Sequence, residues 1–226
     1  MVGWVHTEEG LRLPRAEEVR VRGLPLLEAA LPPGPVRRQG RQGGRLLRRR
    51  GVKRALAPGE LGEELAGRGV VPVSPVPLCR ALGARLALAL LEDLPLRRRA
   101  VVLRGEGVTA AARALALALC PEVGVLLLDL GRGQEELEAL LRSRYGAPAL
   151  PLGLGPPPRV TVELAPVPPR EGLGQVLRLW GEPDLAGLTV TDGEPVPAGM
   201  EPLPLLELLW ETGRRELRDF QVARKP

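Results

Sequence analysis

Apolar residues in the middle of the chain form two short continuous runs separated by a helical pattern. Residues 101–129 read VVLRGEGVTAAARALALALCPEVGVLLLD: an apolar strand, an alanine- and leucine-rich helix and a second apolar strand. The segment 131–146 has acids in its first turn, arginines in its last turn and a glycine at its end, which predicts a second helix. A third short strand is expected at 147–153. This β-α-β-α-β succession predicts a parallel sheet with right-handed crossovers.

The first ninety residues are less regular and mix short apolar runs with glycine, proline and arginine. Apolar residues at helical spacing predict a buried helix over 77–92. The segment 23–35 is compatible with one short helix that its prolines end. Residues 37–54 predict a loop broken by glycines that leads into a short helix around 45–50. Short strands are expected at 2–7, 52–57 and 70–73, with an acidic helix at 58–69.

The character of the chain changes after the prolines at 156–158. Three segments, 159–166, 175–181 and 187–193, alternate apolar with polar residues, which is typical of half-buried antiparallel strands or strands added at a sheet edge. Residues 202–213 predict a short helix that ends at a glycine, and a tail follows.

The turn between the first central strand and its helix carries a recognisable motif. Its sequence, Gly105-Glu106-Gly107-Val108-Thr109-Ala110, has the spacing G-x-G-x-x-A. An acid, Asp129, ends the next strand 24 positions after the first glycine. Glycines at these places allow a tight turn and a close approach of the backbone to a phosphate, and the small sixth residue lets helix and strand pack closely.

On this turn and Asp129, the segment resembles the NAD(P)-binding Rossmann superfamily. The resemblance implies that Gly105, Gly107, Thr109 and Ala110 surround the phosphates of a cofactor such as NAD(P), that Asp129 binds a ribose hydroxyl, and that Arg132 accepts a 2′-phosphate. The same acid would suit the ribose of S-adenosylmethionine. The rest of the chain looks like a bacterial protein and does not resemble any particular enzyme family.

A structural explanation of the same turn stays open. Small residues also allow a helix to begin tightly after a strand, and Glu106 is favoured there by the helix dipole. A carboxylate inside the turn would repel the phosphates of a dinucleotide. Arg132 fits a solvated loop as well as a phosphate site.

We therefore expect an α/β protein whose centre, at 97–152, is a Rossmann-like parallel sheet flanked by helices. N-terminal α/β elements at 1–96 precede it. A small strand-rich extension at 153–226 follows and packs with its helix on the same sheet.

Composition limits the chemistry. The chain of 226 residues has a hydrophobic fraction of 44% and a charged fraction of 26%, typical of a globular protein. It contains no isoleucine and no asparagine but 28 glycines and 25 prolines, which indicates a GC-rich genome. Such codon bias also enriches arginine, so the net charge of +5 is weak evidence for a polyanionic partner.

The cysteines and apolar segments bear on location. Cys79 and Cys120 lie in apolar helical contexts and predict buried, inert thiols rather than a disulfide framework or a zinc site. No signal peptide is evident, and the apolar runs fall short of a membrane span. A cytoplasmic location without membrane contact is expected.

Catalytic machinery is not evident. The only histidine, His6, is interpreted as a strand-end residue, and the paired carboxylates are interpreted as solvated helix faces. No metal-ligand motif or P-loop motif occurs. We therefore assign no catalytic residue and favour a protein without enzymatic activity.

The segment 37–54 is a second candidate site, because it holds nine basic residues and no acid. It is able to bind the phosphates of RNA or DNA, or an acidic protein, although a solvated basic loop also explains it. Its basic residues are Arg37, Arg38, Arg41, Arg45, Arg48, Arg49, Arg50, Lys53 and Arg54.

Three functional hypotheses follow. The first is a nucleotide or dinucleotide pocket at the glycine turn. The second is an adaptor that binds nucleic acid or an acidic partner through 37–54. The third is a structural or regulatory subunit whose Rossmann unit is empty.

Overall fold

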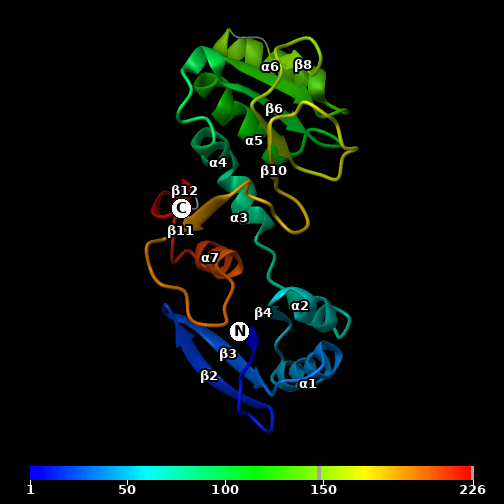
Figure 1. Ribbon diagram of the computed structural model, residues 1–226, viewed down its shortest axis with the longest axis vertical. Coiled ribbons are helices and arrows are strands. Elements are labelled where there is room, and N and C mark those ends of the chain that lie inside the picture. The colour runs from blue at the N-terminus through cyan, green and yellow to red at the C-terminus, as the bar shows by residue number, and fades with distance from the viewer. Residues whose placement is uncertain (147–148, 225–226) are drawn as a thin grey trace. The chain divides into compact units, whose positions relative to one another are not determined.

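The computed structural model describes residues 1–146 and 149–224, which form two compact units. The first unit combines residues 1–75 with 191–219, and the second contains 76–190 and the strand that follows residue 219. Figure 1 shows how the chain passes from one unit to the other and back. Among the described residues, no helix is long and apolar enough to cross a membrane.

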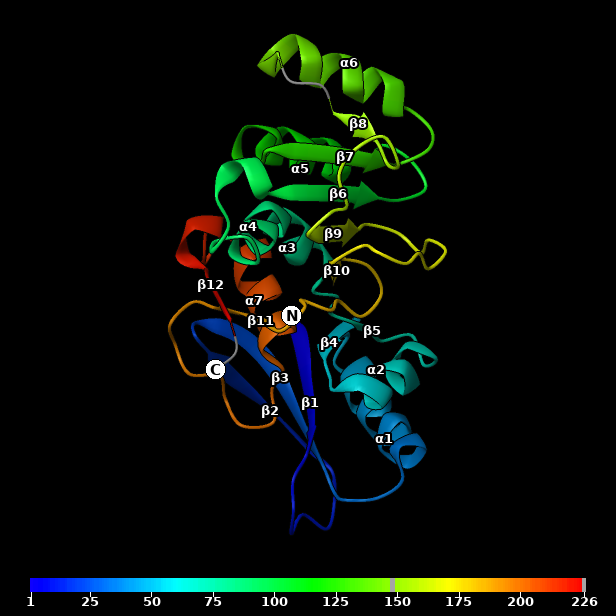
Figure 2. The ribbon, with the colours of Figure 1, turned by 45° about the horizontal axis from the view of Figure 1, so that its top comes forward.

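The second unit is built on a parallel five-stranded sheet with the order β10-β9-β6-β7-β8. The chain starts at the central strand β6, passes through α5 to β7 and through α6 to β8, and then continues with β9 on the other side of β6. Figure 2 shows β6 and β7 side by side, pointing in the same direction. The strands are β6 (Ala100–Arg104), β7 (Val125–Asp129), β8 (Leu150–Pro151), β9 (Val160–Glu163) and β10 (Gln175–Arg178).

Residue character explains these strands. β6 is buried at all five positions and β7 at its three central ones, as expected for apolar strands in the interior of a parallel sheet. One face of the sheet packs Val102 and Leu127 against Leu152 and Leu173, which lie in loops. The helices of this unit are α3 (Val76–Ala81), α4 (Gly83–Ala89), α5 (Ala110–Leu119) and α6 (Gln134–Tyr145).

The strand order identifies the architecture. Because the chain moves outward on one side of β6 and then on the other, its topology is the Rossmann order, and the direction of winding reverses between β6 and β9. The second unit is therefore a Rossmann-like α/β fold, as the sequence predicted. A two-stranded sheet of β11 (Leu188–Thr191) and β12 (Gln221–Arg224) completes the strands in this part of the chain.

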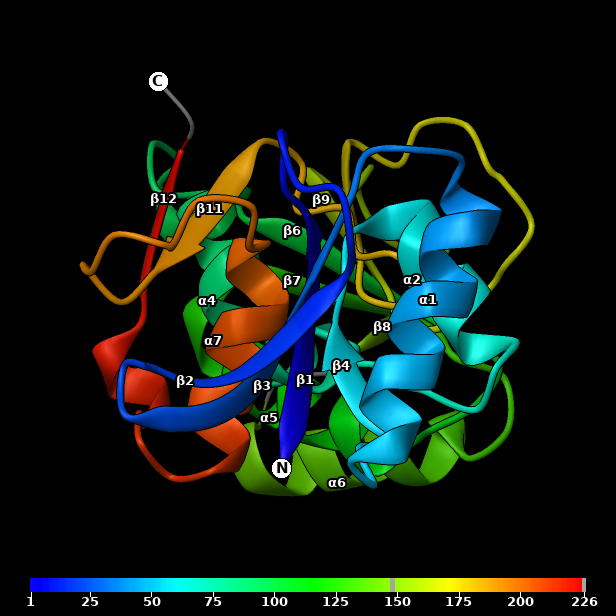
Figure 3. The ribbon, with the colours of Figure 1, turned by 90° about the horizontal axis from the view of Figure 1, so that it is seen from below.

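The first unit has its own five-stranded sheet, with the order β2-β3-β1-β4-β5. All neighbours are parallel except β2 and β3, which form an antiparallel pair. Figure 3 shows α1 and α2 along one side of these strands and α7 along the other. The elements are β1 (Val2–Thr7), β2 (Arg15–Val21), β3 (Leu24–Leu31), α1 (Val36–Arg49), β4 (Arg54–Leu56), α2 (Gly59–Ala66), β5 (Val71–Pro72) and α7 (Pro202–Glu211).

The short helix expected in 23–35 was wrong, because this segment forms the strand β3. Residues 26–31 pair with β1 and residues 24–30 with β2, and seven of the eight residues of β3 are buried. Leucine and alanine favour a helix locally, but pairing on both sides of the strand overrides that preference.

The loop expected at the start of 37–54 was also wrong. Residues 36–49 form one continuous helix, α1, whose buried face carries Gly40, Gly43 and Gly44. A Cβ atom on Gly40 would lie 2.6 Å from the Cβ of Glu64 in α2. The glycines that seemed to break the helix therefore allow it to pack closely against its neighbours.

Two further expectations need correction. The helix predicted over 77–92 is divided at Leu82 into α3 and α4, where Gly83 approaches Leu115 and Leu179 closely. Of the two alternatives for 159–166 and 175–181, antiparallel strands or strands added at a sheet edge, the antiparallel one was wrong, because β9 and β10 are parallel to β6. β9 lies inside the sheet and β10 at its edge, which is why only β10 keeps three exposed residues.

The strand expected at 147–153 begins outside the described residues, and its described part contains β8. The two units have limits near residues 75, 190 and 219, and α7 groups with the first unit. The division into three segments with limits at 96 and 152 stays a prediction from the sequence.

Candidate functional site

The glycine turn lies at the carboxyl end of β6, beside the point where the order of strands reverses. Ligands of open α/β sheets bind outside the carboxyl ends of the strands at such a point. The two loops that follow β6 and β7 bring together the residues that the sequence singled out, which are Gly105, Gly107, Thr109, Ala110, Asp129 and Arg132.

Thr109 begins the helix α5 as its N-cap. Its backbone is extended, and its side-chain oxygen accepts a hydrogen bond of 3.1 Å from the backbone N–H of Ala112. The cap satisfies one of the free N–H groups of the first turn, while the helix dipole leaves partial positive charge there. Ala110 is the first helical residue and is exposed.

The backbone of the turn is held by the loop after β7. The N–H of Gly105 donates to the carbonyl of Asp129 at 3.0 Å, and the N–H of Val108 donates to the carbonyl of Arg132 at 2.9 Å. Gly107 and Arg132 form a parallel bridge. These bonds extend the pairing of β6 and β7 beyond the strands, so the turn is pre-ordered and two of its amides are already used.

A row of charged side chains crosses the sheet at this edge. Arg104 is opposite Asp129 on one side and opposite Glu163 on the other, so all three point to the same face. The guanidinium of Arg104 donates to Asp129 Oδ2 at 2.9 Å, to Glu163 Oε1 at 3.1 Å and to the carbonyl of Pro168 at 2.9 Å.

This arrangement limits what Asp129 can do. The side chain of Arg104 is 4% exposed, whereas that of Asp129 is 40% exposed. Asp129 therefore balances a buried cation and still faces solvent, so any ribose contact would share the carboxylate with Arg104. A buried arginine without its acids would be strongly unfavourable.

Arg104 and Glu163 were missed in the sequence. An arginine at the end of an otherwise apolar strand was the available signal, because such a side chain requires acidic partners when it is buried. Glu163 was not identifiable as that partner, since it lies on a strand 59 positions further along the chain.

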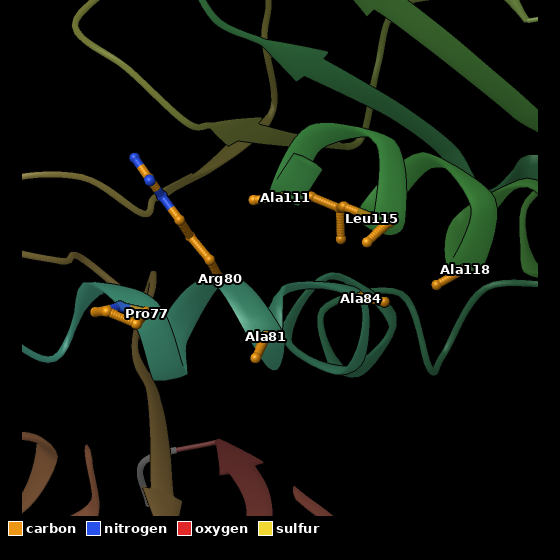
Figure 4. A pocket seen from close by; sticks show the side chains of 8 residues that line it. Pro77, Arg80, Ala81, Ala84, Ala111, Leu115 and Ala118 are labelled. Carbon is orange, nitrogen blue, oxygen red and sulfur yellow. The ribbon is translucent and has the colours of Figure 1, made fainter. Parts of the chain in front are cut away.

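A groove of about 590 Å³ lies along α5, next to its first turn. Figure 4 shows α3 and the start of α4 on one side of it and α5 on the other. Arg80 is its one charged lining residue, and its guanidinium donates to the carbonyls of Leu164 and Leu179 at 2.6 and 3.0 Å. The remaining lining is small and apolar: Pro77, Ala81, Ala84, Ala111, Ala114, Leu115 and Ala118.

The nine basic residues of 37–54 do not lie together in one cluster. Arg54 lies in β4 and forms two hydrogen bonds with Glu211, of 2.7 and 2.9 Å. These bonds raise the pKa of Arg54 and, from the other side, lower the pKa of Glu211. Arg50 caps the end of α1, and Lys53 lies between α1 and β4. The other six arginines are exposed on α1: Arg37, Arg38, Arg41, Arg45, Arg48 and Arg49.

The single histidine is paired. His6 Nε2 lies 2.7 Å from Glu28 Oε1 on the neighbouring strand, and its ring stacks on Trp4 with centroids 4.4 Å apart. Both side chains of the pair are largely buried. Among the described residues, no group of three or more histidine, cysteine or acidic side chains could hold a metal ion.

Comparisons with known proteins add little to this geometry. No family model and no curated protein matches the chain. Among solved structures, the chain is similar to the L-tryptophan dehydrogenase from Nostoc punctiforme, with 13% identity and a TM-score of 0.31. The match covers 61% of this chain and 44% of that enzyme, and at this TM-score it carries no argument about function.

Proposed function

We propose that the second unit binds a nucleotide whose phosphates lie at the first turn of α5. The observation that carries the proposal is the position of the glycine turn at the reversal of strand order between β6 and β9. The helix N-terminus supplies free N–H groups and partial positive charge to an anion at this place.

Two features of the turn favour phosphate over an empty scaffold. Gly107 has no side chain that would cover the backbone of the turn, and a Cβ there would be in ordinary van der Waals contact with the carbonyl of Arg132, at 3.5 Å. The side chain of Arg132 is exposed on the neighbouring loop, within reach of the same turn. Arg132 would neutralise one phosphate, including a 2′-phosphate.

The base of the nucleotide fits the apolar groove that begins at Ala111. Its volume of about 590 Å³ lies in the range of small-molecule sites, which is about 300–1,000 Å³. The alanines leave space for a flat ring system, and Arg80, the one charged lining residue, is held by the carbonyls of Leu164 and Leu179.

Glu106 gives the proposal a specific test. Its carboxylate is exposed within the turn and would repel a phosphate there. At about 4 Å in water this repulsion is about 1 kcal/mol, so Glu106→Gln should tighten phosphate-containing ligands about fivefold. Glu122→Gln is the matched control, because it removes an exposed carboxylate beyond the opposite end of α5.

Binding is measured by thermal shift and calorimetry with NAD⁺, NADH, NADP⁺, NADPH, ATP, GTP, S-adenosylmethionine and inorganic pyrophosphate. A ligand at 100 times its dissociation constant should add about 2.7 kcal/mol to stability. We expect a shift for at least one nucleotide, increased in Glu106→Gln and unchanged in Glu122→Gln. No shift with any phosphate ligand, or binding of S-adenosylmethionine alone, would contradict the proposal.

A variant that fills the groove distinguishes binding of the nucleotide base from binding of its phosphates. Ala114→Leu should weaken nucleotides at least tenfold and leave pyrophosphate unaffected, because Ala114 lines only the groove. Ala139→Leu, on the exposed face of α6, is the control for the added side chain. Equal nucleotide affinity in both variants would show that the groove is not used.

A further inference from the structure

The first unit carries a charged surface that the nucleotide proposal does not use. The exposed arginines of α1 recur at positions 37, 38, 41, 45, 48 and 49. At 3.6 residues per turn, these six positions fall within an arc of about 120° on one side of the helix. With a rise of about 1.5 Å per residue, the row is about 18 Å long. We call it the arginine face of α1.

We propose that the arginine face of α1 binds the phosphate backbone of a double-stranded nucleic acid. The geometry fits because a band of cations about 18 Å long spans about five base pairs of duplex, at 3.4 Å per pair. Arginine is also the cation whose planar donors match phosphate oxygens.

The arginine face is not neutralised by acids of its own unit. None of its six side chains forms an ion pair in the part of the chain that the structure describes, whereas Arg22, Arg54 and Arg215 of the same unit all do. The acids of the neighbouring helix α2 have other contacts. Glu64 packs against Gly40 and pairs with Arg68, and Glu60 and Glu63 line a cleft beside Val36.

The buried side of α1 explains why its arginines all lie on the exposed side of the helix. Gly40, Gly43 and Gly44 hold the helix close to α2 and the sheet, with Leu47 fully buried at the next turn. The buried face of the helix thus consists largely of small residues, and its six arginines are exposed. Two of them, Arg37 and Arg38, lie at the positive end of the helix dipole, where their charge is unfavourable unless an anion binds.

A duplex suits this surface better than a single strand. Proteins that bind single strands use aromatic side chains on which bases stack, and α1 contains none. Recognition through phosphates alone is independent of sequence and applies to DNA and RNA duplexes alike. Experiment distinguishes a DNA duplex from an RNA duplex.

The test is fluorescence anisotropy of the whole protein with a DNA duplex and an RNA duplex of the same sequence, each about twenty base pairs long. Each arginine–phosphate contact contributes about −0.9 to the slope of log affinity against log salt for B-form DNA. We expect a slope of about −4 to −5 and a loss of at least a hundredfold between about 50 and 200 mM salt. Whichever duplex binds more tightly, DNA or RNA, is the nucleic acid that the arginine face of α1 prefers.

Paired substitutions test whether the duplex binds at the arginine face of α1. Arg41→Gln with Arg45→Gln should weaken binding about tenfold and reduce the steepness of the slope by about 2, because two contacts are lost. Arg97→Gln with Arg98→Gln makes the same change of net charge at two exposed positions in the second unit and should leave binding unchanged. Arg41→Lys with Arg45→Lys keeps the charge and should restore most of the affinity. Glutamine has a helix propensity close to that of arginine, so α1 is retained, as circular dichroism would verify.

Several results would overturn the inference. A slope shallower than about −2 would show that no more than about two phosphates are contacted. An equal loss of affinity in both glutamine pairs would show that only net charge matters. Tighter binding to polyglutamate, or to vesicles of phosphatidylserine and phosphatidylcholine, than to either duplex would assign the face to an acidic protein or a membrane instead. The nucleotide assays are unaffected by these outcomes.

Discussion

At the scale of single residues, Asp192 is a buried carboxylate held by two arginines of the first unit. Its side chain is fully buried, and both carboxylate oxygens lie 2.8 Å from Nη1 of Arg22, with Nε of Arg215 at 3.2 Å. Burial raises the pKa of Asp192, but the backbone N–H of Glu194 and the two guanidinium groups outweigh it and hold the pKa below its usual value. The carboxylate is therefore charged in the folded protein.

Asp192→Asn should lower the free energy of unfolding at neutral pH by about 3 kcal/mol, because it leaves two guanidinium groups without their buried partner. Since the folded state lowers the pKa of Asp192, its stabilising contribution is complete above about pH 4–5. It is lost as the pH falls below about 4 and through the folded-state pKa. Denaturant melts at pH 7 and pH 3 should therefore show a difference between wild type and variant that shrinks in acid.

The control for this prediction is Glu216→Gln. Glu216 pairs with Arg218 on the surface, where both side chains are well exposed, so its melting temperature should match that of the wild type. A difference between wild type and Asp192→Asn that is equally large at pH 3 and pH 7 would contradict the charge-based explanation.

At the scale of elements, the close packing of α1 against α2 can be tested at its glycines. A Cβ on Gly40 would meet the Cβ of Glu64 at 2.6 Å, whereas nothing lies within 4 Å of a Cβ on Gly59 at the start of α2. Gly40→Ala should therefore destabilise the protein by about 1–3 kcal/mol through overpacking, despite alanine's higher helix propensity. Gly59→Ala should be neutral or slightly stabilising. Thermal melts of the two variants make the comparison, and a stabilised Gly40→Ala protein would disprove the close contact.

At the scale of the whole molecule, the two cysteines report on unfolding of the second unit. Cys79 and Cys120 are buried, and burial raises the pKa of the Cys120 thiol, so little of Cys120 is thiolate at neutral pH. We expect a thiol reagent to label neither cysteine in the native protein and both in denaturant, at a rate that follows opening of this unit. Immediate labelling of one equivalent in native protein would show that one thiol is reactive.

The sequence predicted the elements whose signals are local. The glycine turn, the two strands around it and the helix that ends at Gly146 were all identified, because β-sheet burial and helix caps leave a mark on adjacent residues. The parallel order of β6, β7 and β8 also followed from the alternation of strands and helices.

The failures occurred where distant parts of the chain decide the structure. The helical propensity of 24–31 is overridden because β1 and β2 pair on both sides of that segment. The glycines of α1 predicted a loop, because nothing in the local sequence shows that α2 and the sheet pack on them. The parallel placement of β9 depends on pairing with β6, which lies about sixty residues earlier.

The candidate site divides in the same way. By itself the sequence determined the α/β class, the glycine turn and the excess of arginine in 37–54, since composition and short-range spacing encode them. Only the tertiary structure decided that Asp129 shares its carboxylate with Arg104 and that six arginines form one face of a helix. It also decided that residues 191–219 belong with the N-terminal unit. Those features depend on contacts between residues far apart in the chain, whose energies become specific only when the fold brings the partners together.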